Sequence, residues 1–412
     1  MAEISKGPHI GVLSSRFPSS LYPGLGLPIR ERMFRVARRL PLFVVSPTPW
    51  VPLEDWFRQN LNPGFRPSIP EYEEQQGIPV WFPRFLSMPG PDMLRLPEGW
   101  TMARGAYHRF AALRSAGRLD LIDAHGAYPD GHAAVLLGRR IGVPVTVTLH
   151  SDGLNCARNP GRLRKLRETL GGAARVFAAS ETLRQFALEL GVPDGRVEVV
   201  GNGVDAECFR PRDRTAARAA LGIPSDAPVL ISSSPDRFFG EKDYNQLIEA
   251  LPALSRRLPK LVCLLVGLDS LEKNRRATLE AMVERLDLKE TVRFLDDLPP
   301  DELPGILSAA DVFVSAAYHE TPVTTLLEAM ACGLPVAAFD VGANRELVCR
   351  PEFGELAPLG DPSALKTAID LALSRTWDRM TIRRHSEAYS WDGRINRLCR
   401  AFTEIVAAWR TG

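Results

Sequence analysis

The sequence predicts an α/β fold built from two doubly wound domains, and two observations predict it. Short apolar segments alternate with helical segments from Leu121 to Val200, and a second alternating series runs from Val229 to Phe339. Strands that are separated by helices form parallel sheets with helices on both faces. With 412 residues, the chain is also long enough for two domains of ordinary size.

The composition is that of a globular protein, and it argues against several classes. Hydrophobic residues make up 45% of the chain and charged residues 24%. The formal net charge of +2 is too small to indicate nucleic acid as the main partner. The longest apolar run, Leu261 to Val266, is too short to cross a bilayer, and the first residues lack the apolar core of a signal peptide. Six scattered cysteines without a C-x-x-C pair are typical of free thiols, so a cytoplasmic protein is expected.

The first half of the chain predicts a parallel sheet with polar residues at the ends of its strands. Strands are expected at 9–13, 121–124, 145–149, 175–178 and 197–200, and helices at 29–40, 131–140 and 181–190. Ligands bind at the carboxyl ends of such strands. Asp123-Ala-His125, His150-Ser-Asp152 and Gly201-Asn-Gly203 are therefore expected at a ligand site. Residues 47–97 are rich in Pro and aromatic residues and weakly periodic, apart from a strand at 80–82, which indicates a functional or mobile insert.

The loop after the first strand and the helix that follows it each allow two interpretations. Gly24 and Gly26 either let the backbone approach a ligand or form a plain surface turn. The helix at 29–40 combines apolar residues with arginines at positions 30, 32, 35, 38 and 39. A basic amphipathic helix can lie on an anionic membrane surface, and the ordinary alternative is a solvated arginine face.

The second half is organised around the stretch from Tyr318 to Glu346. Thr325 and Glu328 fit a capping box, with Thr at the N-cap and Glu three residues later. Gly333 then ends a short helix, and residues 336–339 form a buried strand. A loop that leads into a helix N-terminus offers free N–H groups and a partial positive charge, which suit a phosphate. Glu320 and Glu328 flank this point.

The stretch resembles the donor-site signature of family 4 glycosyltransferases. The matching residues are Glu320, seven further residues, Glu328 and then Ala-Met-Ala-Cys-Gly-Leu-Pro-Val. Members of that family are retaining enzymes of the GT-B fold that use nucleotide-diphosphate sugars. One departure is that residues 321–323 are Thr-Pro-Val, whereas the family usually has Gly, an aromatic residue and Gly.

The resemblance also implies a domain division. Asn202-Gly-Val-Asp205 resembles the segment that ends the first domain in the family. The expected GT-B architecture has two Rossmann-like domains facing across a cleft, with residues 1–210 on the acceptor side and residues 211–389 binding the donor. The last helix, about 390–412, is expected to pack back onto the first domain, and the 47–97 insert is expected to supply acceptor-side loops.

A cation pair for the donor diphosphate is implied by the same resemblance. Arg237 and Lys242 stand in register with Leu247-Ile-Glu-Ala250, where the family places the two cations. Asp236 and Asp243 replace the family's two glycines. Since the chain also lacks a D-x-D triplet, neither a metal nor another cofactor is expected.

Further site roles follow only from the resemblance. Glu328 would accept bonds from the ribose hydroxyls, and Glu320 would lie against the donor sugar. The backbone N–H groups of Thr324, Thr325 and Leu326 would hold phosphate oxygens.

On the acceptor side, His150 and Asp152 resemble the family's His-Gly-Ser-Asp segment without its Gly. They would orient a sugar hydroxyl and the acceptor. The alternative for His150 is a packed structural histidine, and this is the expectation for His125.

Together these features predict a retaining, metal-independent glycosyltransferase. It would move a sugar from a UDP- or GDP-sugar to a glycan or lipid-linked acceptor in cell-envelope or exopolysaccharide biosynthesis. It would work in the cytoplasm, or at the inner membrane face through the helix at 29–40. Two rival functions stay open: a nucleotide-sugar 2-epimerase of the same fold, and a non-catalytic scaffold that binds sugar nucleotides.

Overall fold

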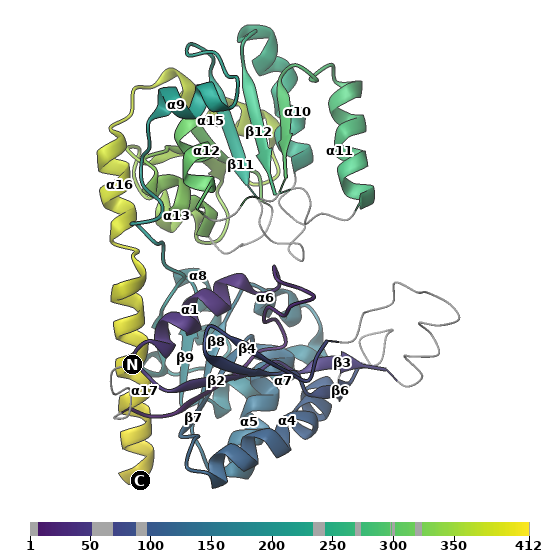
Figure 1. Cartoon of the computed structure of the whole chain (residues 1–412), viewed down its shortest axis with the longest axis vertical. Coiled ribbons are helices and arrows are strands. Elements are labelled where there is room, and N and C mark those ends of the chain that lie inside the picture. The colour runs from purple at the N-terminus through teal and green to yellow at the C-terminus, as the bar shows by residue number, and fades with distance from the viewer. Residues whose placement is uncertain are drawn as a thin grey trace. The chain divides into compact units, whose positions relative to one another are not determined.

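The computed structural model divides the chain into two compact units (Figure 1). It describes residues 7–51, 69–87, 97–233, 244–267, 273–296, 298, 301–317 and 324–411. Unit 1 comprises Met1–Gly201 and Arg394–Gly412, and unit 2 comprises Asn202–Gly393. The division that the sequence places between residues 210 and 211 thus lies between Gly201 and Asn202 in the structure.

Unit 1 contains a sheet of eight described strands in the order β10-β9-β8-β7-β1-β2-β5-β4. Adjacent strands are parallel except β4 and β5. The strands are β1 (Ile10–Leu13), β2 (Leu42–Val45), β4 (Tyr72–Gln75), β5 (Ile78–Trp81), β7 (Leu121–His125), β8 (Val145–Leu149), β9 (Arg175–Ala178) and β10 (Val197–Val199). A separate parallel pair consists of β3 (Thr48–Trp50) and β6 (Arg84–Leu86).

Helices cover both faces of this sheet. They are α1 (Leu27–Ala37), α4 (Glu98–Ser115), η1 (Ala127–Gly131), α5 (His132–Ile141), α6 (Asp152–Ala157), α7 (Pro160–Gly172), α8 (Glu181–Glu189), η2 (Asp194–Arg196) and α17 (Trp391–Thr411). Successive strand residues point to opposite faces of a sheet. Val176 packs into the core beneath α5 and α7, whereas the next residue, Phe177, contacts Phe402 of α17 with the ring centroids 5.8 Å apart. The end of the chain therefore covers the opposite face of unit 1.

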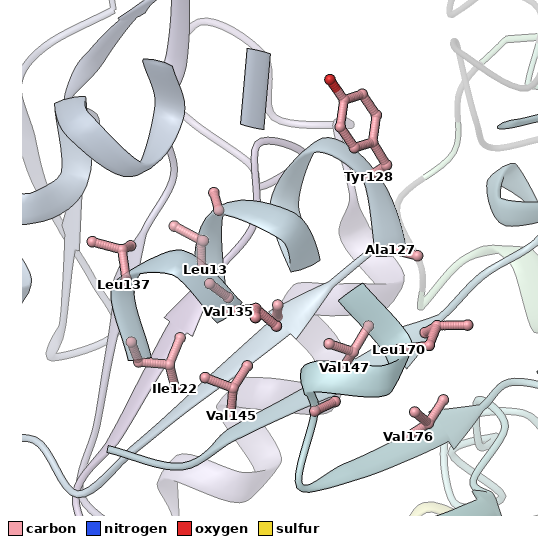
Figure 2. Close-up of a cluster of buried hydrophobic side chains, with 14 of the residues drawn as sticks. Leu13, Ile122, Ala127, Tyr128, Val135, Leu137, Val145, Val147, Leu170 and Val176 are labelled. Carbon is pink, nitrogen blue, oxygen red and sulfur yellow. The ribbon is translucent and has the colours of Figure 1, made fainter. Parts of the chain in front are cut away.

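The main core of unit 1 lies between the sheet and helices α4, α5 and α7. Figure 2 shows strand residues meeting helix residues there: Ile122, Val145, Val147 and Val176 from the strands, Val135 and Leu137 from α5, and Leu170 from α7. The other face of β7 and β8 is polar, because Asp123, His125, Thr146 and Thr148 alternate with these apolar residues and are all buried.

Unit 2 contains a fully parallel sheet of six described strands, in the order β13-β12-β11-β14-β15-β16. This is the 3-2-1-4-5-6 order of a Rossmann fold. The strands are β11 (Val229–Ser233), β12 (Val262–Val266), β13 (Val292–Leu295), β14 (Val312–Ser315), β15 (Val336–Phe339) and β16 (Gly354–Ala357). The helices are α9 (Arg214–Ala220), α10 (Tyr244–Arg257), α11 (Lys273–Arg285), α12 (Leu303–Ala309), α13 (Thr324–Ala331), α14 (Asn344–Leu347), α15 (Pro362–Ser374) and α16 (Arg379–Glu387).

The sheet of unit 2 is apolar on both faces. Ile231 and Phe313 belong to one buried cluster, which includes residues of α12 and α13. Their neighbours Leu230 and Val312 belong to a second cluster with residues of α10, α11 and α15. Near-continuous apolar strands are typical of parallel sheets that helices cover on both sides.

The structure confirms the predicted alternation of strands and helices and corrects several details. The described residues 42–51 and 69–87 contain β2 to β6 where only a strand at 80–82 was predicted, because Pro and aromatic residues obscure the period of the short strands. The helix expected at 29–40 spans Leu27–Ala37. Helix α13 begins at Thr324, so Thr325 is a helical residue and the predicted capping box is wrong. None of the helices in the described ranges is both long and apolar enough to cross a membrane.

Candidate functional site

Each unit has one position where the strand order reverses, and ligands bind to doubly wound sheets at the carboxyl ends of strands at such positions. In unit 1 the reversal lies between β1 and β7, and in unit 2 it lies between β11 and β14. Ser14, His125 and His150 are at or just beyond the ends of β1, β7 and β8. These ends are where the sequence places the acceptor-side residues.

Four polar side chains form a continuous chain of contacts on β7 and β8. The Thr146 hydroxyl donates to Oδ1 of Asp123 at 2.7 Å. Oδ2 of Asp123 lies 3.2 Å from Nε2 of His125. Nδ1 of His125 lies 3.3 Å from Nε2 of His150, and the two rings are stacked with centroids 5.6 Å apart. The structure therefore joins His150 to His125, for which the sequence indicates only a separate structural role.

Arg32 of α1 adds a buried positive charge on the same face of the sheet. Its side chain is 1% exposed, and Nη2 donates to the carbonyl oxygen of Val200 at 2.8 Å. Burial lowers the pKa of Arg32 to about 10, although the nearby Asp123 carboxylate counteracts that shift. Burial, together with His125, Arg32 and Arg16, holds the pKa of His150 well below its usual value. His150 is therefore neutral at physiological pH.

Asp130 fixes the loop after β1 through hydrogen bonds. This buried carboxylate accepts hydrogen bonds from the backbone N–H and the hydroxyl of Ser15. Gly26 has φ +69°, and a Cβ added there would lie 2.1 Å from the carbonyl oxygen of Arg16. Gly26 is thus required for closing the loop, whereas Gly24 has open space where a side chain would be.

The arginines of α1 do not form one solvated face. Arg32 is buried, Arg35 pairs with Glu31, and Arg39 is hydrogen-bonded to Asn396 of α17. Arg38 is exposed. The expectation of a uniform arginine surface is wrong for Arg32, because position 32 lies on the buried stripe formed by its neighbours Ile29, Met33 and Val36.

In unit 2 the predicted donor residues lie at the beginning of α13. Thr324, Thr325 and Leu326 form its first turn, and Glu328 follows in the next turn on a half-buried position. The Asn202 side-chain amide lies 3.5 Å from the Thr324 hydroxyl, so two segments singled out in the sequence meet here. The helix ends before Gly333, whose φ of +78° is the left-handed conformation of a helix stop.

The segment around Asn202 is fixed by the start of α17. A Cβ on Gly203 would lie 2.7 Å from the Trp391 ring, and Val204 forms a β-bridge with Ser390. The Asn202 segment carries the family resemblance in the sequence. The contact between the two segments gives the Asn202 turn a fixed support beside α13.

Several predicted site residues cannot be placed. Arg237 and Lys242, between β11 and α10, and Glu320, between β14 and α13, lie outside the described residues.

Asp152 is the first residue of α6. Within the described residues, no group of three or more His, Cys, Asp or Glu side chains could hold a metal ion.

Two buried hydroxyls at the ends of strands have no hydrogen-bond partner. They are Oγ1 of Thr148 on β8 and Oγ of Ser315, the last residue of β14. Buried polar groups are nearly always paired, so such groups need an explanation. The sequence contains no signal for them beyond their position at strand ends.

Family comparisons cover both units. Residues 213–388 match the model described as Glycosyl transferases group 1, and residues 63–207 match Glycosyltransferase Family 4. D-inositol 3-phosphate glycosyltransferase of Saccharomonospora viridis is 32% identical over 73% of this chain and 74% of its own length. The enzyme of the same name from Geodermatophilus obscurus is 32% identical over 76% of this chain and 73% of its own.

Solved structures share the fold of the whole chain. Sucrose-phosphate synthase from Thermosynechococcus elongatus has a TM-score of 0.73 at 22% identity, covering 98% of this chain and 100% of that chain. Anabaena HepE in complex with UDP has a TM-score of 0.70 at 19% identity, covering 96% of this chain and 100% of that chain. The likeness extends over both Rossmann-like units, which is the GT-B fold. The chain belongs to glycosyltransferase family 4 and is a glycosyltransferase of the GT-B fold.

Proposed function

We propose that this enzyme transfers a sugar from a UDP- or GDP-sugar to a hydroxyl of a glycan or lipid-linked acceptor, with retention of anomeric configuration and without a metal. Unit 2 binds the donor in this proposal, and unit 1 binds the acceptor. The observation that carries the proposal is the start of α13 at the strand-order reversal of unit 2, with Glu328 in its second turn.

The donor part rests on the chemistry of a helix N-terminus. The N-terminal N–H groups of α13, at Thr324, Thr325 and Leu326, and the helix dipole suit the oxygens of a diphosphate. Glu328 would accept hydrogen bonds from ribose hydroxyls. Arg237 and Lys242 would neutralise the leaving diphosphate, and Glu320 would lie against the sugar. The UDP complex of the structurally similar HepE supports a nucleoside diphosphate as the ligand class.

The reaction needs no protein nucleophile. The bond between the sugar C1 and the diphosphate oxygen breaks, and a bond from C1 to the acceptor oxygen forms on the same face. The acceptor proton passes to the leaving phosphate, which makes the nucleoside diphosphate the base. The chain's residues supply positioning and charge stabilisation, which are the main sources of catalysis in such a step. His150 and Asp152 orient the acceptor hydroxyl.

The acceptor class is the less constrained part of the proposal. A glycan or lipid-linked acceptor in envelope or exopolysaccharide synthesis fits what the resemblance implies. The relatives named D-inositol 3-phosphate glycosyltransferase make that phosphorylated polyol an acceptor to test alongside it. In this proposal the enzyme works in the cytoplasm, and a lipid-linked acceptor would bring it to the inner membrane face. Arg38, at the C-cap of α1, is an exposed arginine for such contact.

A transfer assay tests the proposal. Purified enzyme in EDTA is given UDP- and GDP-sugars with either inositol 3-phosphate or a lipid-linked glycan, and the anomeric configuration of the product is determined by NMR. We expect transfer from one nucleotide class with retention. Inversion, a strict metal requirement or release of an epimerised sugar without an acceptor would contradict the proposal, and the last outcome would favour the 2-epimerase.

A further inference from the structure

We propose that Asp123 and His125 are positioning residues that fix which nitrogen of His150 carries its proton, leaving Nδ1 of His150 as the hydrogen-bond acceptor for the incoming hydroxyl. The inference rests on the proposed function for the identity of that hydroxyl. The arrangement of the three side chains does not depend on it.

The first step is the contact between Asp123 and His125. A carboxylate only accepts hydrogen bonds, and Oδ2 of Asp123 lies 3.2 Å from Nε2 of His125. This contact lacks hydrogen-bond geometry, but the negative charge 3.2 Å from Nε2 favours a proton on that nitrogen over a lone pair. The Thr146 hydroxyl donates to the other carboxylate oxygen at 2.7 Å and fixes the orientation of the carboxylate.

The second step is the contact between the two histidines. With its proton on Nε2, a neutral His125 has a lone pair on Nδ1, which lies 3.3 Å from Nε2 of His150. Only a protonated Nε2 of His150 can complete a hydrogen bond to that lone pair. The neutral His150 then has its own lone pair on Nδ1.

The charges around the cluster support neutral rings. Arg32 from α1 and Arg16 from the loop after β1 both act on His150, and each disfavours a positive charge on it. Arg32 already supplies the positive charge that compensates Asp123, and the His125 side chain is fully buried. The surrounding charges therefore favour a neutral His150 ring.

The third step concerns what Nδ1 of His150 can do. No residue in the described part of the chain is hydrogen-bonded to this nitrogen, and His150 retains an exposed part of its surface at the end of β8. An acceptor nitrogen at this point receives a hydrogen bond from a hydroxyl. It cannot donate one to a phosphate. The assigned partner is thus a hydroxyl group of the acceptor, and not a phosphate group.

Nuclear magnetic resonance on the full chain tests the proton position without any substrate. Long-range nitrogen–proton spectra of 15N-histidine-labelled protein distinguish the two neutral forms of each ring, and His150→Gln identifies the His150 signals. We expect the Nε2-protonated form of His150 in the wild type, and loss of that preference in Asp123→Asn and His125→Gln. An Nδ1-protonated His150 in the wild type, or unchanged signals in both variants, overturns the inference.

A matched control removes another carboxylate beside a histidine. Asp120, three residues before Asp123, accepts from the His9 backbone N–H and lies 3.5 Å from its ring. Asp120→Asn is expected to leave the His150 signals unchanged.

If Asp123→Asn fails to fold, Thr146→Val and Thr146→Ser replace it, because only the serine retains the hydroxyl that holds the carboxylate. Identical His150 signals in those two variants would also overturn the inference.

Turnover then separates this inference from the proposed function. Asp123→Asn and His125→Gln are expected to lower kcat by about 10- to 100-fold while the KM for the donor sugar is unchanged, as for the loss of groups that orient a functional histidine. Thr146→Ser is expected to retain wild-type kcat. Absence of transfer by the wild type would refute the proposed function, whereas normal kcat in both variants would refute only the positioning role.

Discussion

The sheets of the two units share a winding pattern but differ in the chemistry of their inner strands. In unit 1, β7 and β8 bury Asp123, His125, Thr146 and Thr148 on one face. In unit 2, β11 and β14 bury apolar residues on both faces, and their polar residues are serines near the carboxyl ends. Unit 2 instead presents its polar groups on α13.

This difference determines what holds each site in place. The unit 1 site consists of side chains that are also part of the fold, so its ionisation and the stability of the unit are coupled. The unit 2 site begins on an apolar support, so its residues can be changed with little effect on folding. Under the proposed function, the same fold therefore supplies one charge-sensitive site and one ligand-sensitive site.

The largest effect on stability is expected when the buried charge of unit 1 is removed. We expect Arg32→Met to lower the free energy of unfolding by about 3 to 5 kcal/mol, because it leaves the buried Asp123 carboxylate without a compensating charge. Arg38→Met, at the exposed C-cap of the same helix, should change it by less than about 0.5 kcal/mol. Denaturant titration measures both, and equal losses would refute the coupling.

The corresponding test in unit 2 is Glu328→Ala. Hydrogen bonds to a charged group contribute about 1.5 to 3 kcal/mol, so donor kcat/KM should fall by about 10- to 150-fold. Because Glu328 is half-buried on an apolar support, we expect the free energy of unfolding to change by less than about 1 kcal/mol. Steady-state kinetics and denaturant titration measure the two effects. A large loss of stability with unchanged kcat/KM would reverse the roles of the two units.

The stability of the two units should also respond differently to acid. Burial lowers the pKa of His150 and His132 in unit 1, and of His385 in unit 2, below the ordinary histidine value of 6.5. The unfolded chain then binds protons that the native protein does not bind, so stability is fully present above that value and is lost as the pH falls from it toward the lowered pKa values.

We expect the greater loss in unit 1, which has two of these three histidines. Hydrogen exchange as a function of pH resolves the two units, and His150→Gln should reduce the pH dependence in unit 1. The exposed His108→Gln is the control and should leave it unchanged. Equal acid sensitivity of the two units would contradict the comparison.

The smallest expected effects concern the two buried hydroxyls without partners. Thr148→Val in unit 1 and Ser315→Ala in unit 2 each remove an unsatisfied polar atom. We expect each substitution to raise the free energy of unfolding of the ligand-free protein by up to about 1 kcal/mol. Thermal unfolding measures this, and a loss of stability would show that the hydroxyls are hydrogen-bonded in solution.

The alternation of strands and helices could be read from the sequence because the strands are short, apolar and evenly spaced. The residues at the end of β7 and β8 could also be placed at one edge of a sheet. The strands β2 to β6 could not, because Pro and aromatic residues interrupt a period that extends over only three or four positions. The predicted boundary between the units and the predicted start of α13 differ from the observed positions by up to several residues. Local sequence defines the ends of elements poorly.

The side-chain contacts of the unit 1 site could be predicted only in part. Residue order gives Asp123, His125 and His150 a common edge, but their stacking depends on strand register, which sequence does not specify without a partner strand. The burial of Arg32 had a signal in its spacing from Ile29, Met33 and Val36. Its charge concealed that signal, because arginine is rarely buried.

We propose, above all, that unit 2 binds a nucleotide sugar independently of the polar cluster in unit 1. Calorimetric titration of UDP- and GDP-sugars in EDTA, on wild type, Glu328→Ala and Asp123→Asn, tests it most directly. We predict that wild type and Asp123→Asn bind one nucleotide class with equal affinity and that Glu328→Ala binds it about 10-fold or more weakly. Unchanged binding by Glu328→Ala, or no binding by the wild type without metal, would contradict the claim.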